Sequence, residues 1–332
     1  MNEFLQYEKK DFNVIYPSLP EIIDFHVHVG LTAPFPFLKC DINNENADNA
    51  KYLGTSNPRT FDDEKFYHNN FPSMLSPGFL PYSVAYLYKM FKFFPTCTIQ
   101  NLLKYKKKYN IKKIVIQIID FPKLNQCEKI LKSASNHKNL VMFCYVDPKD
   151  PGMENQLKRY KKLGASGLKY HPIVSGINPS CDSAMKLFQK CSELNMPVLS
   201  HSGQGPVKKG FGKDPSRMEY FEPVFSNFPD LKFILAHIGS VEYKKAIDFA
   251  LKYDNVYLET SESPAFVIKE AAEKLAGEKI FFGTDYSFNH PAVPLSILLD
   301  ATKNNEEFRE KILILNAENF LEENTPLDNS FF

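Results

Sequence analysis

Short apolar runs alternate with longer amphipathic segments along most of the chain. Eight runs rich in Ile, Val, Leu and Phe span residues 21–28, 111–120, 140–148, 167–172, 196–203, 231–240, 255–261 and 279–287. Apolar positions with helical spacing occur in the segments 83–94, 97–110, 153–165, 182–195, 216–229 and 305–323. Apolar strands separated by helices are typical of a parallel sheet. Eight such strands predict a (β/α)8 barrel rather than a doubly wound sheet, which usually has fewer strands.

Residues 29–81 interrupt this alternation directly after the first predicted strand. The segment is rich in Pro, Asn and Asp, and in a barrel it would leave from the face where active sites are built. We expect a distorted barrel that forms a single domain over residues 1–332, with 29–81 as a long insertion. A lid, a disordered segment and a partner surface remain alternatives for this insertion.

Histidines gather at the predicted strand ends. The chain has eight histidines, and five of them lie at or near the C-terminal end of a predicted strand: His26, His28, His171, His201 and His237. Active sites of (β/α)8 enzymes are built at that face. A single histidine there would usually be a hydrogen-bonded core residue, but five together indicate a functional site.

The first run, "EIIDFHVHVG", carries Asp24, His26 and His28 at every second position. Side chains two apart on a strand share a face, so all three are expected to project into one space. Neutral imidazoles and a carboxylate suit a divalent metal, with Zn²⁺ the expected ion and Mn²⁺, Fe²⁺ and Co²⁺ as alternatives. His201 in "VLSHSG" and Asp285 in "FFGTDYS" are available to complete a site of three histidines and one aspartate.

A metal in such a site acidifies water, so a nearby base must carry the proton away. His237 in "ILAHIG" lies at the correct face for that role, and Asp285 could share it. We therefore expect His237 and Asp285 to be the catalytic residues.

Seven segments, in order, resemble the amidohydrolase superfamily, and in particular its amidohydrolase-related branch, which includes aminocarboxymuconate semialdehyde decarboxylase. They are "DFHVHVG", "GLKYHP", "PVLSHSG", "FPDLKFILAHIGS", "VYLETS", "FFGTDY" and "ILNAENFLEE", from about residue 21 to residue 321. The resemblance implies a distorted (β/α)8 barrel and the metal ligands His26, His28, His201 and Asp285. It also implies that His237 orients or deprotonates the water.

The lysine of "GLKYHP" leaves the number of metal ions open. In binuclear members of the superfamily a carboxylated lysine at this position bridges two ions, and Lys169 would then act with His201 and His237. The branch that this chain most resembles carries one ion, which we favour. Lys169 would then hold a substrate carboxylate or oxyanion as a point charge, unless it is a barrel-interior lysine paired with a carboxylate such as Asp24.

Three further residues are weaker candidates for the site. His171 points inward from the same predicted strand as Lys169, and Arg217 could bind an anionic substrate group, although a surface role is favoured for it. Glu259 could line the pocket or support a ligand histidine. We expect Lys169, His171 and Arg217 to be the substrate-binding residues.

The leading functional hypothesis is a metal-dependent hydrolase of a small amide, lactone or related carbonyl compound. The alternative is a non-oxidative decarboxylase of an unsaturated or aromatic acid on the same metal site. A barrel that has lost its activity and serves as a scaffold is disfavoured, because a buried polar cluster is costly to keep.

Charge and composition add few constraints. Forty Lys and Arg residues nearly balance 39 Asp and Glu residues, and no nucleic-acid-binding motif is visible, so a nucleic-acid partner is not expected. The six cysteines lack CxxC spacing and fit a reducing cytoplasm. No apolar stretch reaches the ~18 residues of a membrane span, and the N-terminus does not resemble a signal peptide. We expect a cytoplasmic enzyme with a small-molecule substrate, in the form of a homodimer.

Overall fold

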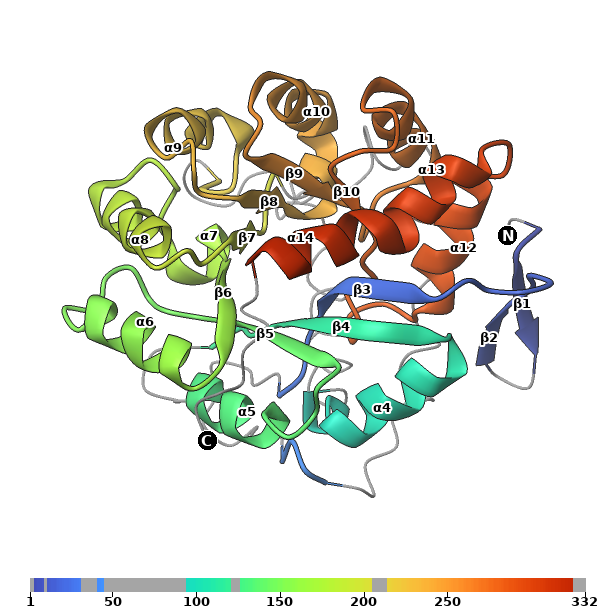
Figure 1. The fold of residues 1–332 in the computed structure, drawn as a ribbon, viewed down its shortest axis with the longest axis horizontal. Coiled ribbons are helices and arrows are strands. Elements are labelled where there is room, and N and C mark those ends of the chain that lie inside the picture. Colours follow the sequence, from blue (N-terminus) through green and yellow to red (C-terminus); the bar gives the residue numbers. More distant parts are fainter. Residues whose placement is uncertain are drawn as a thin grey trace, which may run out of the picture.

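The computed structural model describes residues 3–8, 11–30, 41–44, 94–120, 126–204 and 214–324. Within these ranges eight parallel strands form one sheet whose order follows the chain (Figure 1). They are β3 (Ile22–Val27), β4 (Ile111–Gln117), β5 (Leu140–Cys144), β6 (Ala165–Tyr170), β7 (Val198–Ser200), β8 (Phe233–Leu235), β9 (Val256–Glu259) and β10 (Ile280–Phe281). Each strand overlaps one of the eight predicted runs, so these predictions are confirmed.

Hydrogen bonds between β3 and the residues that follow β10 close the sheet. Phe25 N donates to Phe282 O at 2.8 Å, and Asp285 N donates to His26 O at 2.8 Å. The first and last strands of the order are thereby joined, and helices surround the strands in Figure 1. The predicted (β/α)8 barrel is confirmed.

Helices follow most strands and pack outside the barrel. They are α4 (Ile99–Lys108), α5 (Gln126–Ala134), α6 (Met153–Lys162), α7 (Pro172–Ser175), α8 (Asp182–Glu193), α9 (Glu222–Asn227), α10 (Tyr243–Lys252), α11 (Ala265–Lys274), α12 (Ala292–Ala301), α13 (Glu306–Glu310) and α14 (Asn316–Asn324). The predictions at 97–110, 153–165 and 182–195 match α4, α6 and α8. Gly164 follows α6 with a φ of 93°, a conformation that favours glycine at a helix end.

Two predicted helices are divided in the structure. The segment 216–229 forms a short 3-10 turn (Met218–Tyr220) before α9, where Pro223 occupies the first helical turn and needs no amide donor. The segment 305–323 forms α13, a π-helical turn (Lys311–Leu315) and α14. The predicted helix 83–94 lies almost wholly outside the described residues, as does most of the predicted insertion 29–81.

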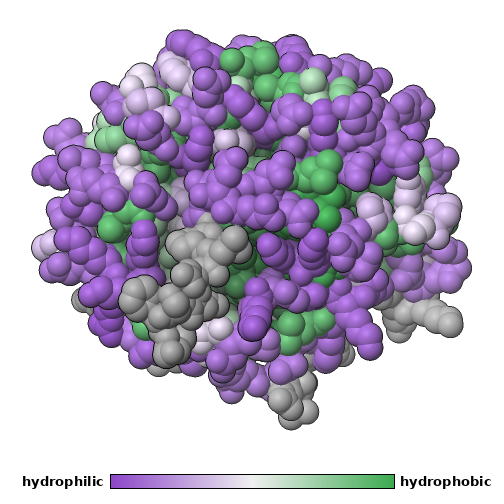
Figure 2. All heavy atoms as spheres, viewed as in Figure 1, coloured by the Kyte–Doolittle hydropathy of each residue, from purple (hydrophilic) through white to green (hydrophobic). Residues whose placement is uncertain are grey.

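Aromatic side chains fill the barrel interior. The ring of Phe25 stacks on Phe281 at 4.5 Å and meets Phe143 edge-on at 5.9 Å. Phe320 of α14 reaches the same cluster, 5.0 Å from Phe281. Helix α14 lies across one mouth of the barrel (Figure 1), and the surface over it is mostly hydrophilic (Figure 2). This packing closes one end of the barrel.

An antiparallel hairpin precedes the barrel and was not predicted. It consists of β1 (Leu5–Glu8) and β2 (Asp11–Val14). It packs against α12, and the ring of Phe12 lies 5.3 Å from that of His290. In the described ranges, no helix has both the length and the apolar character needed to cross a membrane.

Candidate metal centre

A bulge near the end of β3 determines which side chains of this strand face the barrel. Asp24 pairs with Ile114 of β4, whereas Val27 pairs with Ile116. Three steps along β3 therefore oppose two steps along β4. An extra residue of this kind redirects the side chains that follow it and is common next to active sites.

The bulge separates Asp24 from the two imidazoles. The Asp24 carboxylate accepts hydrogen bonds from Tyr105 Oη of α4 and from Thr284 Oγ1, each at 2.6 Å. Burial raises the pKa of Asp24 to about 6, although these hydrogen bonds lower it. The expectation that Asp24, His26 and His28 share one space is therefore wrong for Asp24, because the alternation changes phase at the bulge. Pairing of Asp24 with Lys169 is not found either.

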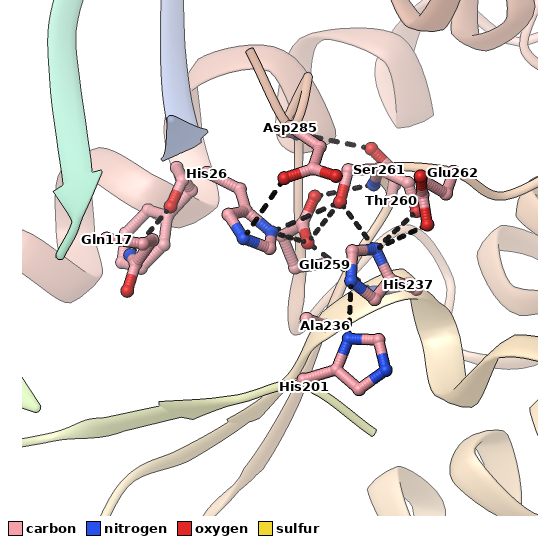
Figure 3. Close-up of polar contacts among 12 residues, drawn as sticks. His26, Gln117, His201, Ala236, His237, Glu259, Thr260, Ser261, Glu262 and Asp285 are labelled. Carbon is pink, nitrogen blue, oxygen red and sulfur yellow. Dashed lines mark hydrogen bonds and ion pairs between the residues drawn. The ribbon is translucent and has the colours of Figure 1, made fainter. Parts of the chain in front are cut away.

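Three predicted ligand atoms converge at the end of the barrel. Nε2 of His26 lies 3.1 Å from Nε2 of His28, and Oδ1 of Asp285 lies 3.0 Å from His28 and 3.6 Å from His26. Figure 3 shows the Asp285 carboxylate directed at His26. These three side chains form a buried group that could hold a metal ion.

The partners of the other ring nitrogens indicate which tautomers are present. Nδ1 of His28 lies 2.6 Å from the carbonyl oxygen of Gln117, which can only accept, so this nitrogen carries the proton. Nδ1 of His26 lies 2.7 Å from the Glu259 carboxylate. Burial, together with nearby Lys169, lowers the pKa of both rings well below the ordinary value. Both Nε2 atoms therefore direct lone pairs at each other and at Asp285, an arrangement that fits a bound cation.

A buried carboxylate network supports His26 from the side opposite its Nε2 atom. Glu259 is fully buried at the end of β9 and accepts a hydrogen bond from Ser261 Oγ at 2.8 Å. Ser261 Oγ also lies 2.9 Å from Nδ1 of His237. Burial raises the pKa of Glu259 to about 8. The prediction that Glu259 supports a ligand histidine agrees with this geometry, whereas sequence reasoning gave Ser261 and Gln117 no role.

His237 and His201 meet because two loops approach at glycines. A Cβ on Gly203 would lie 1.7 Å from the carbonyl oxygen of Gly239, so this contact requires glycine. Nε2 of His237 lies 3.1 Å from Nδ1 of His201, and Nδ1 of His237 lies 3.2 Å from Ser261 O. Figure 3 shows His201 beyond His237, away from Asp285.

His201 is therefore placed differently from the other predicted ligands. It belongs to none of the three groups of possible metal-binding residues found among the described residues. Its ring stacks on that of His171 at 4.6 Å, and Nε2 of His201 and Nδ1 of His171 are buried without a hydrogen-bond partner. The predicted roles of these two residues as metal ligand and substrate-binding residue stay predictions.

Lys169 of β6 points into the same cluster. Its Nζ atom lies 3.0 Å from Nε2 of His26, and the side chain is almost fully buried. Burial lowers the pKa of Lys169 to about 8, and the nearby carboxylates of Asp285 and Glu259 oppose that shift. The ammonium group of Lys169 is thus the positive charge next to the lone pairs of His26, His28 and Asp285.

Another possible ligand group combines His237, Glu262 and Asp285. All three residues have positive φ angles, of 61°, 55° and 54°. Non-glycine residues rarely adopt this conformation, and it persists where the surrounding structure enforces it, often at functional sites. Burial raises the pKa of Asp285 to about 7. Sequence reasoning missed Glu262, although its position three residues after Glu259 was a possible signal.

Arg217 lies at the start of the 3-10 turn after β7. Its Nη2 atom pairs with Oε2 of Glu219 at 3.2 Å, and its side chain is 36% exposed. Its predicted contact with an anionic substrate group stays a prediction.

Comparisons with known proteins give one family and a set of similar folds. A family model described as Amidohydrolase matches residues 124–322. No curated protein matches the sequence. An uncharacterized TIM-barrel protein from Bordetella bronchiseptica is similar in structure, with a TM-score of 0.62 and 17% identity over 92% of this chain and 99% of that chain.

Two solved enzymes have similar folds. The probable 2-pyrone-4,6-dicarboxylic acid hydrolase from Acinetobacter baumannii gives a TM-score of 0.56 and 14% identity, covering 91% of this chain and 100% of that chain. The 5-carboxyvanillate decarboxylase from Novosphingobium aromaticivorans, complexed with manganese, gives a TM-score of 0.58 and 14% identity, covering 91% and 96%. At these identities the matches show a shared fold.

Proposed function

The chain belongs to the amidohydrolase family, and from that premise we propose that it is a metal-dependent hydrolase of a small amide, lactone or related carbonyl compound. The observation that carries the proposal is the convergence of two neutral imidazoles and one carboxylate, His26, His28 and Asp285, at the end of the barrel. The lone pairs of these atoms converge on one point, and Nζ of Lys169 lies beside it, 3.0 Å from Nε2 of His26.

We propose His26, His28 and Asp285 as ligands of one divalent ion, with His201 as a fourth ligand by family resemblance. Zn²⁺ suits this set of imidazole and carboxylate donors, and Mn²⁺ is also compatible with it. Such an ion supplies Lewis-acid polarisation of a carbonyl group and a water that ionises near neutral pH.

Side chains of the protein would transfer the protons and stabilise the charge of the substrate. Nδ1 of His237 donates to the Ser261 carbonyl, so Nε2 of the neutral ring, which lies 3.1 Å from Nδ1 of His201, is the nitrogen that can take a proton. Asp285 can accept a proton from water and pass it to the leaving group with His237. The ammonium group of Lys169 can hold a substrate oxyanion or carboxylate as a point charge.

The second candidate is a non-oxidative decarboxylase of an unsaturated or aromatic acid. It is supported by the similar fold of 5-carboxyvanillate decarboxylase and by Lys169, which could hold the carboxylate that leaves. Release of carbon dioxide without hydrolysis would distinguish it from the hydrolase. A homodimer, and a cytoplasmic location inferred from the scattered thiols, remain further proposals.

Metal content per chain tests the proposal. Elemental analysis of protein purified without chelator should give about one ion per chain, consistent with a mononuclear site. The His26→Ala variant should lose it, and the Lys169→Ala variant should retain it. His137→Ala is the matched control, because His137 lies in a turn before β5, away from the cluster.

Other outcomes lead to different conclusions. Two ions, one of which depends on Lys169, would favour a binuclear centre with a carboxylated lysine. Absence of metal after reconstitution would contradict the proposal. Asp285→Asn should abolish turnover while the far-UV circular dichroism spectrum is unchanged, and unchanged turnover would contradict the proposed proton transfer.

A further inference from the structure

Gln117 lies at the end of β4, next to the strand that carries two of the proposed metal ligands. Its side chain is fully buried, with an exposed fraction of 0%. Val27 of β3 pairs with Ile116, so the register places Gln117 beside His28. Figure 3 shows Gln117 at the end of the cluster away from His201. Gln117 therefore borders the candidate metal centre on the side of β3.

The side-chain amide of Gln117 holds the bulge in β3. Its Nε2 atom donates to the carbonyl oxygen of Phe25 at 3.0 Å, and this orientation of the amide is fixed because a carbonyl oxygen can only accept. Phe25 lies inside the bulge, between Asp24 and Val27, which both pair with β4. Bulged residues are left out of the ladder, so their main-chain groups need other partners. A side chain of β4 supplies that partner and ties the bulge to the neighbouring strand.

The main-chain carbonyl of the same residue orients His28. It accepts a hydrogen bond from Nδ1 of His28 at 2.6 Å. The lone pair of this ring is therefore on Nε2, which lies 3.0 Å from Oδ1 of Asp285. A contact on the far nitrogen of a ligand imidazole fixes the orientation of the ring and its tautomer. Gln117 thus contacts both the segment that presents the two imidazoles and one of the imidazoles itself.

Packing alone does not explain an amide at this position. Oε1 of Gln117 is buried and has no hydrogen-bond partner in the protein, and such an atom costs free energy. An apolar side chain would avoid that cost, as Val115 and Phe143 do at neighbouring positions in the barrel interior. The hydrogen bond from Nε2 to Phe25 is what the amide provides and an apolar residue could not.

We propose that Gln117 is a positioning residue of the metal centre. Its amide fixes the bulge that presents His26 and His28, and its main-chain carbonyl fixes the ring of His28. This inference rests on the proposed function, because it requires that His26 and His28 bind a divalent ion. Gln117 acts through these two residues and is not itself a ligand.

Zinc affinity tests this role without a substrate. Gln117→Met removes the amide and keeps an unbranched side chain of similar length. The dissociation constant of Zn²⁺ is measured on the intact protein by competition with a chromophoric chelator. We expect Zn²⁺ to bind about ten- to hundredfold more weakly to the variant, the usual effect of losing a group that supports a metal ligand. A loss of less than about fivefold would overturn the proposal.

Val115→Ala is the matched control for a general disturbance of the barrel. Val115 lies on β4, is fully buried and belongs to the same interior cluster as Phe25. Its replacement should lower the stability in urea and leave the Zn²⁺ affinity unchanged. At saturating Co²⁺, the visible absorption spectrum should change in Gln117→Met and not in Val115→Ala, because it reports the geometry of the ligands. Equal losses of Zn²⁺ affinity in the two variants would overturn the proposal.

A second variant covers the case in which Gln117→Met does not fold by circular dichroism. Gln117→Asn keeps the amide but is one methylene too short to reach the Phe25 carbonyl, so it should weaken Zn²⁺ binding in the same way. Wild-type affinity in this variant would overturn the proposal.

The wild type separates this inference from the proposed function. A wild type that binds neither Zn²⁺ nor Mn²⁺ would overturn the metal centre, and the role of Gln117 with it. A wild type that binds Zn²⁺, with Gln117 variants that bind it equally well, would overturn only the role of Gln117.

Discussion

Replacing Gly283 by alanine should displace the carboxylate that supports His26. A Cβ on Gly283 would lie 2.1 Å from Oε1 of Glu259 and 2.8 Å from Cβ of His26, both far shorter than an ordinary contact. Glu259 is held by His26 and Ser261 at 2.7 and 2.8 Å. The carboxylate therefore cannot move aside without losing hydrogen bonds.

The expected loss of stability combines the overpacking by the new Cβ with the loss of a hydrogen bond to Glu259. Overpacking a buried site costs about 1–3 kcal/mol, and leaving a buried hydrogen-bonding group without its partner costs about 1–3 kcal/mol. We expect Gly283→Ala to lower the free energy of unfolding by about 3 kcal/mol. Gly152→Ala is the control, because the added Cβ would come no closer than 3.3 Å to Asp150 Oδ1. Its effect should stay within about 0.5 kcal/mol.

Urea denaturation followed by far-UV circular dichroism measures these changes, since the chain contains no tryptophan. EDTA is present so that the metal-free protein is compared throughout. A double-mutant cycle with Glu259→Ala identifies the cause, because removing the carboxylate removes the shortest contact. The combined loss should be smaller than the sum of the single losses by about 1 kcal/mol or more. Additive losses would refute the argument.

Two further predictions concern the same end of the barrel. Tyr105→Phe removes a donor 2.6 Å from the fully buried Asp24 carboxylate, so it should lower the free energy of unfolding by about 1–3 kcal/mol; wild-type stability in urea would contradict this. Removing metal with EDTA should lower the thermal midpoint, because a ligand bound only to the folded state stabilises it by about 4 kcal/mol at a thousand times its Kd. Zn²⁺ or Mn²⁺ should restore the midpoint, and His26→Ala should show no response to either treatment.

The barrel could be predicted because its signal is local and repeated. Every strand of the barrel overlaps a predicted apolar run, and α4, α6 and α8 match amphipathic segments. The N-terminal hairpin was missed because its two four-residue strands are stabilised by packing against α12, which lies far away in the sequence. The divided helix around Pro223 shows how one residue overrides a longer amphipathic pattern.

The candidate site was predicted in its composition more than in its arrangement. The pair His26 and His28 and the carboxylate of Asp285 do converge. Asp24 faces α4 instead, and His201 contacts His237 rather than that group. Glu262 was missed because its approach to His237 depends on a left-handed backbone conformation in the loop after β9.

Periodicity and residue identity are local properties, so the chain alone predicts the strands of the barrel, their order and the imidazoles and carboxylates at their ends. Which of these side chains meet depends on the folded arrangement. The bulge in β3, the contact between Gly203 and Gly239 and the close approach of Gly283 to Glu259 all join segments far apart in the chain. Such contacts depend on register and loop geometry, which a pattern along one strand does not contain.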